Sequence, residues 1–370
     1  MEEQLQKIII KNISDHFGIE VDEIKLTFPP KKNLGDFCFH CGLLSKHLRK
    51  NPIEIAKELS TILEKDDIFD EATEMGPYVN FKVSKSIFVS QFSKMYSDIE
   101  GYLSPKKGAG QTIVIDYIGA NVGKTLHIGH MCTPNQGQVM VNLYKKLGYN
   151  VISDSHIGDW GIIFGKLITA YKHWGDESRL EENAVDYLLE LYVRISKEVE
   201  NSPELEQQTR DEFKLLSSGN EESKIIWSNF TSYSITAMNK LLDRLNVKPD
   251  YNIGESFYEG LGLKKMENNP DLTDDMHTIV QSLVEKQIAT KNEDNSVGVV
   301  FPDETKLSSC ILQKRDGTHG YLASDLACIY YRMTHWSPSK IIYFVDLRQK
   351  LHFEQAFEVA KSANWLQRKE

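Results

Sequence analysis

The stretch Asn121-Val122-Gly123-Lys124-Thr125-Leu126-His127-Ile128-Gly129-His130 is the clearest indication of how this chain folds. It follows a β-branched run at residues 113–115 and leads into residues 136–147, where apolar Val139, Met140, Leu143 and Leu147 recur at helical spacing. Two imidazoles and a glycine therefore lie where a strand passes into a helix. A helix start offers unpaired N–H groups and a positive dipole end to a phosphate. Gly129 would leave room for a nucleotide, and His127 and His130 can donate hydrogen bonds to phosphoryl oxygens.

An ATP site is the hypothesis that this stretch raises, and a pair of helix-start histidines without a ligand is the alternative. An H-x-G-H pattern is short, so it occurs by chance in unrelated chains. Its context favours the ATP site, because Lys124 lies three residues ahead of the first histidine and further matches follow downstream.

Composition indicates a globular protein of two or three domains. The chain has 370 residues, of which 41% are hydrophobic and 26% charged. No apolar run reaches membrane-spanning length and the N-terminus has no secretory signal, so we expect a cytoplasmic protein without membrane contact. The net charge of −10 argues against a protein that coats nucleic acid, although a local patch can still contact RNA. Residues 176–222 carry 14 Asp/Glu and 5 Lys/Arg, and we expect this stretch to face water.

The five cysteines are expected to be reduced thiols, since their number is odd and the chain does not need disulfides to fold. Cys38 and Cys41 have the spacing of a redox motif or half a zinc site. A zinc site needs about four ligands and no second pair exists, so we interpret them as two half-buried cysteines on a helix.

Two domains are predicted, at residues 1–105 and 106–370. The first is a small α+β domain with helices at 5–17, 43–49 and 52–63, the last capped by Asn51, and a strand at 78–83. The second reads as α/β, a Rossmann-type parallel sheet with a mostly helical insertion at about 175–295. Its strands are expected at 113–116, 150–153 and 340–345, a β pair at 296–301 and 306–313, and helices at 136–147, 167–174, 325–333 and 353–362. Ligands in such sheets bind at the carboxyl ends of the strands.

Six segments together resemble the class I arginyl-tRNA synthetases. They are residues 115–130 (IDYIGANVGKTLHIGH), 151–165 (VISDSHIGDWGIIFG), 320–327 (GYLASDLA), 342–353 (IYFVDLRQKLHF), 34–37 (LGDF) and 75–81 (MGPYVNF). The last two are similar to the extra N-terminal domain of that family. The chain departs from the family at Ile118, Gly119, Ala120, Gly123 and Thr125. The family also continues with a KMSKS-type loop and a helical anticodon-binding domain, so we expect a fragment.

The resemblance implies ATP-dependent activation of L-arginine and its transfer to the 3′ end of tRNA-Arg. It implies contacts to arginine by Asp116, Asn121, Tyr321, Asp325 and Gln349, because carboxylates hold a guanidinium strongly. It implies phosphate contacts by His127, His130 and Lys124, and further ATP contacts by Gly129 and His352. Mg²⁺ is expected with ATP, without a dedicated protein cage. His156 and Asp159-Trp160-Gly161 are expected at the pocket floor.

Four of these residues also have an ordinary structural interpretation. Asp325 suits a helix N-cap, Tyr321 a strand core, Lys124 a solvated loop and His352 a helix-start cap.

The resemblance further implies a monomer whose N-terminal domain binds tRNA. Lys31 and Lys32 belong to its basic group, and Phe37 and Phe39 offer a stacking face unless they are core residues. A nucleotidyltransferase with the same H-x-G-H site and a non-catalytic RNA- or partner-binding relative are the alternative functions.

Overall fold

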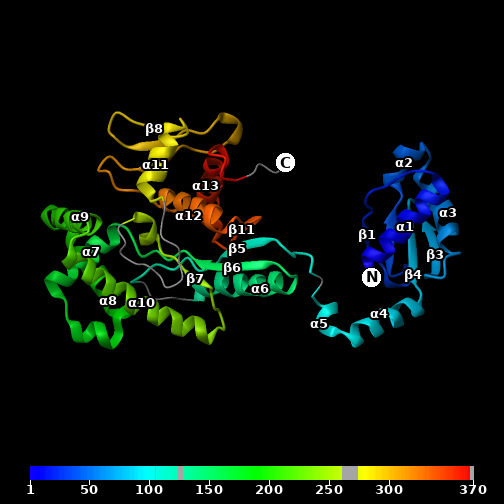
Figure 1. Cartoon of the computed structure of the whole chain (residues 1–370), viewed down its shortest axis with the longest axis horizontal. Coiled ribbons are helices and arrows are strands. Elements are labelled where there is room, and N and C mark those ends of the chain that lie inside the picture. The colour runs from blue at the N-terminus through cyan, green and yellow to red at the C-terminus, as the bar shows by residue number, and fades with distance from the viewer. Residues whose placement is uncertain (105, 124–127, 261–273, 367–370) are drawn as a thin grey trace. The chain divides into compact units, whose positions relative to one another are not determined.

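The chain forms two compact units, Met1–Pro105 and Lys106–Glu370. The computed structural model describes residues 1–104, 106–123, 128–260 and 274–366 (Figure 1). In the described part of the chain, no helix is both long and apolar enough to cross a membrane.

The first unit is an antiparallel sheet covered by helices. Its strands lie in the order β1 (Leu26–Thr27), β2 (Phe37–His40), β4 (Tyr78–Val83) and β3 (Phe69–Met75). The helices are α1 (Glu2–Phe17), α2 (Gly42–Leu48) and α3 (Pro52–Leu63), followed by α4 (Lys85–Ser97) and α5 (Ile99–Tyr102). Three residues of α1 at intervals of four, Leu5, Ile9 and Ile13, are buried in the core of this unit.

Two local predictions for this unit have different outcomes. The cap of α3 is confirmed, because the Asn51 side chain accepts a hydrogen bond from the N–H of Ile53 at 3.0 Å. The placement of both cysteines on a helix is wrong. Cys38 lies in strand β2 and Cys41 is the residue before α2, and both are buried free thiols.

The second unit is built on a parallel sheet, as predicted. Its order is β11 (Lys340–Tyr343), β5 (Thr112–Asp116), β6 (Asn150–Ser155) and β7 (Tyr251–Asn252). Tyr343 pairs with Asp116, Asp116 with Asp154 and Asp154 with Tyr251, so these four residues form one row near the carboxyl edge. Figure 1 shows α6 (Cys132–Lys146) on one side of the sheet, and α12 (Tyr321–Trp336) with α13 (Lys350–Ser362) on the other.

Helix α6 confirms the predicted helix after the H-x-G-H stretch. The face that it buries, however, is not the one formed by the apolar residues that predicted it. Val139 and Leu143 are more than half exposed, whereas Gly137 and Val141 are buried. A Cβ on Gly137 would come within 2.1 Å of the Tyr117 side chain. Small residues thus let α6 lie close to the segment after β5, and the periodic apolar residues that revealed the helix partly face water.

After β6 comes α7 (Ile162–Trp174), and the insertion then begins with three helices: α8 (Glu177–Glu200), α9 (Pro203–Ser217) and α10 (Glu221–Arg244). The chain returns to the parallel sheet at β7, within the range predicted for the mostly helical insertion. The carboxylates of residues 176–222 are exposed as predicted, except that of Glu212.

Six further elements lie between β7 and α12 in the described part of the chain. They are η3 (Glu255–Glu259), α11 (Met276–Glu285), β8 (Thr290–Lys291), β9 (Val297–Val299), η4 (Asp303–Thr305) and β10 (Cys310–Gln313). Strands β9 and β10 pair antiparallel and confirm the predicted β pair.

Candidate active site

The loops after β5 and β6 are joined to each other at the carboxyl edge of the sheet. The N–H of Val122 donates to the carbonyl of Gly158 at 3.0 Å, and the N–H of Gly158 donates to the carbonyl of Ala120 at 2.9 Å. A Cβ on Gly158 would lie 2.0 Å from Oδ1 of Asn121, so a larger residue here would displace the Asn121 side chain. The backbone that leads to the H-x-G-H motif is therefore held against the second loop.

A buried arginine occupies the sheet edge beneath these loops. Nη2 of Arg332, on α12, lies 2.7 Å from Oδ2 of Asp116 and 2.8 Å from Oδ2 of Asp154. Arg332 and Asp154 are fully buried and Asp116 is nearly so. Burial raises the pKa of Asp154, and the positive charge of Arg332 opposes that rise. Asp116 thus already has a guanidinium partner, and its expected role as a direct ligand of the substrate guanidinium must be revised.

Asp325 lies in the second turn of the same helix, beside two imidazoles. Its Oδ2 is 2.6 Å from Nε2 of His352, and its Oδ1 is 3.8 Å from Nε2 of His156. Ser324 Oγ lies 3.2 Å from the same nitrogen of His156. Asp325 is therefore not an N-cap, and His352 faces a carboxylate from the first turn of α13 instead of capping that helix.

Tyr321 is the first residue of α12 and 66% of it is exposed, so the strand-core interpretation is wrong. Gln349 ends η5 (Leu347–Gln349), and its side chain accepts from the N–H of Asp346 at 3.3 Å to close a capping box. In this structure the Gln349 side chain therefore caps η5, in the loop after β11.

Glu255 is a site residue that the sequence did not reveal. It begins η3, and its N–H donates to the carbonyl of Ile157 at 2.9 Å. The next residue, Ser256, donates from N and Oγ to the Asp159 carboxylate at 2.8 and 2.7 Å. Burial raises the pKa of Glu255 to about 8, with further contributions from Asp325 and Asp159 and an opposing one from His156.

His156 lies among these acids and has a perturbed ionisation. Burial disfavours the charged imidazolium, but Cys328, Asp325 and Glu255 outweigh it, so the pKa of His156 is raised. Asp325 and Glu255 are thus a pair of acidic side chains that interact electrostatically with each other and with His156. Such a pair suits a cationic ligand that brings its own positive charge.

The phosphate side of the candidate site is described in part. Gly129 and His130 lie in η2 (Ile128–Met131), directly ahead of α6, which confirms a helix start after the motif. His130 lines a small cavity of 20 Å³ together with Gly119, Ala120 and Thr133. Lys124 and His127 lie outside the described residues. Among the described residues, no group of three or more His, Cys, Asp or Glu side chains is arranged to hold a metal ion.

In the first unit, an exposed aromatic ring is found not at the expected positions Phe37 or Phe39 but at Phe28. Phe37 is only 7% exposed and lies between Phe28 and Phe81, with ring centroids 5.5 and 6.1 Å away. Phe39 is buried as well, so both are core residues. Phe28 is 80% exposed, and Lys31 and Lys32, three and four residues later in the sequence, are exposed too. Phe28 was missed because its position after the two-residue strand β1 gave no periodic signal.

Comparison with known proteins identifies both units. Residues 93–369 match the family described as tRNA synthetases class I (R), catalytic domain, and residues 3–83 match the arginyl tRNA synthetase N terminal domain. An arginine–tRNA ligase of Clostridium botulinum (strain Okra / Type B1) is 37% identical over 359 residues, which are 96% of this chain and 61% of that protein. One from Clostridium perfringens is 38% identical over 361 residues, or 97% of this chain and 61% of the relative.

Solved structures show the same fold. The crystal structure of arginyl-tRNA synthetase from Plasmodium falciparum superposes with a TM-score of 0.77 at 21% identity, covering 99% of this chain and 62% of that one. Thermus thermophilus arginyl-tRNA synthetase gives a TM-score of 0.62 at 21% identity, with 90% and 53% covered. The chain spans about 61% of the length of the curated relatives it matches. On the strength of both domain matches, this chain belongs to the family of class I arginyl-tRNA synthetases.

Proposed function

We propose that this chain carries out ATP-dependent activation of L-arginine to arginyl-adenylate and its transfer to the 3′ end of tRNA-Arg. The observation that carries the proposal is the Asp325–Glu255 carboxylate pair beside the loop that leads to His130. A carboxylate pair beside a phosphate-binding loop fits a substrate that is a cation at one end and reacts at the other.

Asp325 and Glu255 bind the guanidinium in this proposal, and Tyr321 and Asn121 complete the arginine site. Asn121 is exposed at the joined loops, and Tyr321 is exposed at the start of the helix that bears Asp325. Asp116 acts indirectly, by fixing Arg332 and with it the position of α12. Gln349 joins the arginine contacts if its capping bond to Asp346 opens.

In the first step an arginine carboxylate oxygen attacks the α-phosphorus of ATP. The bond from that phosphorus to the bridging oxygen breaks, and pyrophosphate leaves. His127, His130 and Lys124 stabilise the added negative charge by hydrogen bonds and electrostatics, and Gly129 admits the nucleotide. His352 contributes to the ATP side through its position next to Asp325. Mg²⁺ accompanies ATP and neutralises phosphate charge when bound.

In the second step the 2′-hydroxyl of the terminal tRNA adenosine attacks the carbonyl carbon, and AMP leaves. The first unit contacts tRNA-Arg through Lys31 and Lys32, with Phe28 in place of Phe37 as the stacking residue. We place the protein in the cytoplasm as a monomer, without membrane contact.

Arginine-dependent exchange of pyrophosphate into ATP, with and without tRNA-Arg, tests the proposal. We expect exchange that the His130→Ala variant abolishes and the His173→Ala variant, which changes an exposed histidine of α7, preserves. Exchange that proceeds unchanged in His130→Ala would refute the phosphate role. Arginine and tRNA binding without exchange would favour the non-catalytic relative instead.

A further inference from the structure

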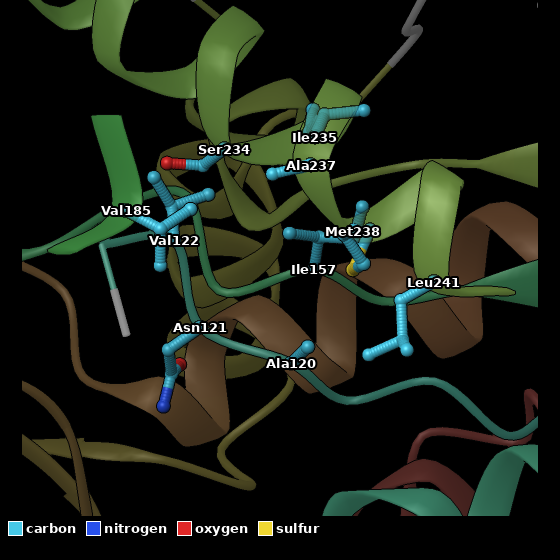
Figure 2. A pocket seen from close by; sticks show the side chains of 10 residues that line it. All are labelled: Ala120, Asn121, Val122, Ile157, Val185, Ser234, Ile235, Ala237, Met238 and Leu241. Carbon is cyan, nitrogen blue, oxygen red and sulfur yellow. The ribbon is translucent and has the colours of Figure 1, made fainter. Parts of the chain in front are cut away.

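An apolar cavity of 180 Å³ lies next to the candidate active site, with which it shares Asn121. Its walls come from the loop at Ala120–Val122, from Ile157 after β6, from α8 at Val185, and from α10 at Ile235, Met238 and Leu241. Figure 2 shows these side chains arranged around it, with the Asn121 amide pointing away from Ile235 and Met238.

One polar group in the wall is unused. Ser234, on α10, is 7% exposed, and its hydroxyl has no hydrogen-bond partner among the described residues. In Figure 2 this hydroxyl lies on the side of Val185 and Val122. A buried hydroxyl without a partner costs free energy that a ligand with a suitable group would recover.

We propose that this cavity binds a small, uncharged aromatic molecule that carries a single hydrogen-bonding group for Ser234. An apolar protein cavity of about 150 Å³ accepts benzene, so 180 Å³ suits one ring or a compact pair of fused rings. Among the described residues, no charged side chain lines the cavity, and there a charged ligand would lose its hydration without compensation. A purine has more polar atoms than one hydroxyl can satisfy, which sets this site apart from a nucleotide pocket.

The position of the cavity connects it to the catalytic loop. Val122 lines it, and the N–H of Val122 is bonded to Gly158 in the joined loops described above. Val185 lies two residues after Asn183, where the backbone of α8 departs from helical geometry at φ −151° and ψ 75°. A ligand here therefore contacts both the helical insertion and the loop that leads to His130.

Indole is the probe that tests the proposal, because it is uncharged and has one N–H donor. In the full chain labelled with ¹³C-methyl methionine, we expect indole to shift the Met238 methyl resonance with a dissociation constant on the order of 1 mM. The Met238→Leu variant assigns that resonance among the nine methionines. Adenine should leave it unmoved. No shift with indole, or a larger shift with adenine, would overturn the ligand class.

Variants on α10 then locate the site. Ala237 lines the cavity from an exposed position, so Ala237→Trp should block binding, whereas Ser232→Trp, exposed on the same helix but not in the lining, should not. Ser234→Ala should weaken indole binding about five- to tenfold and leave its isostere indene, which lacks the N–H, unaffected. Ser196→Ala removes another buried hydroxyl that has no partner in the described part of the chain, and it is the matched control. Indole binding that survives Ala237→Trp, or equal effects of Ser234→Ala on both ligands, would contradict the assignment.

Discussion

At the scale of single residues, the candidate arginine site depends on how its acids are held. Asp325 is already paired with His352, while Glu255 has a pKa of about 8 because burial disfavours its charge. A bound guanidinium favours the charged carboxylate, so arginine must displace a proton from Glu255 below that pH. The ionisation of Glu255 therefore connects arginine affinity to pH.

Arginine affinity should rise with pH up to about 8 and then level off. Glu255 is the group that titrates. The charged groups that act on it are His156 in the loop after β6, Asp325 on α12, and Asp159. Loss of a proton from Glu255 or from His156 strengthens the attraction for a guanidinium, so both act in the same direction. Calorimetry between pH 6.5 and 8.5 should show affinity gains of up to about tenfold per unit. Glu255→Gln should weaken binding and flatten this profile, and an unchanged profile in that variant would assign the titration elsewhere.

Arg332 should be needed for the stability of the second unit. Removal of one partner from a buried ion pair leaves uncompensated charge, so we expect Arg332→Met to cost about 3–5 kcal/mol. All five tryptophans lie in this unit, so denaturant unfolding followed by tryptophan fluorescence reports on it alone. The control is Arg348→Met, which removes an exposed bond of 2.9 Å to Asp346 and should change stability far less, because solvent screens that pair. Equal effects of both variants would mean that the buried network contributes no more than a surface pair.

At the scale of elements, the loop after β6 positions η3 and thus Glu255. Asp159 accepts two bonds from Ser256, and its carbonyl accepts from Nε1 of Trp227 on α10 at 2.7 Å. One loop residue therefore connects the parallel sheet, the insertion and the acid that faces the candidate arginine site.

Asp159→Ala should lower arginine affinity by about tenfold or more, since it releases the start of η3 and misplaces a charge-assisted contact. Asp294→Ala is a matched control, because Asp294 also accepts from N and Oγ of a serine, Ser296, at 3.0 and 2.6 Å. Arginine titrations of both variants, with thermal unfolding alongside, separate positioning from general destabilisation. Arginine affinity that falls equally in both variants would show that η3 is not positioned by this carboxylate.

Elements with strong periodicity could be predicted from the sequence, and those without it could not. The alternating residues of β4 and the apolar spacing of α3 gave correct predictions. Strand β7 has two residues and so no detectable alternation, which hid both the return to the sheet and Glu255 just after it. The buried contact of Arg332 with Asp116 joins residues 216 positions apart, and a single sequence carries no local trace of such a pairing. The sequence left open whether Phe37 is a stacking or a core residue for the same reason, since its burial depends on packing against Phe28 and Phe81.

At the scale of the whole molecule, the two units have separate proposed roles: the second binds arginine and ATP, and the first contacts tRNA. The acids and the H-x-G-H loop belong to the second unit, whereas the exposed Phe28, Lys31 and Lys32 belong to the first. Each unit has its own hydrophobic core, so changes at the surface of one should leave ligand binding in the other intact.

Changes at Phe28 and at the two lysines should therefore weaken tRNA-Arg binding without changing arginine affinity. We expect about a tenfold loss for Phe28→Ala from lost base stacking, and a larger, salt-dependent loss for Lys31→Glu with Lys32→Glu. The pair Lys7→Glu with Lys11→Glu makes the same charge change on exposed residues of α1. Filter binding at two salt concentrations gives the comparison, and equal losses in both lysine pairs would indicate general charge repulsion instead of a specific surface.

The central claim is that Asp325 and Glu255 form a site for the arginine guanidinium. Its most direct test is calorimetric titration of the chain with L-arginine and with citrulline, its uncharged isostere, in the presence and absence of an ATP analogue. We predict that arginine binds, that citrulline does not, and that Asp325→Asn abolishes arginine binding. Equal binding of arginine and citrulline, or no arginine binding under either condition, would contradict the account.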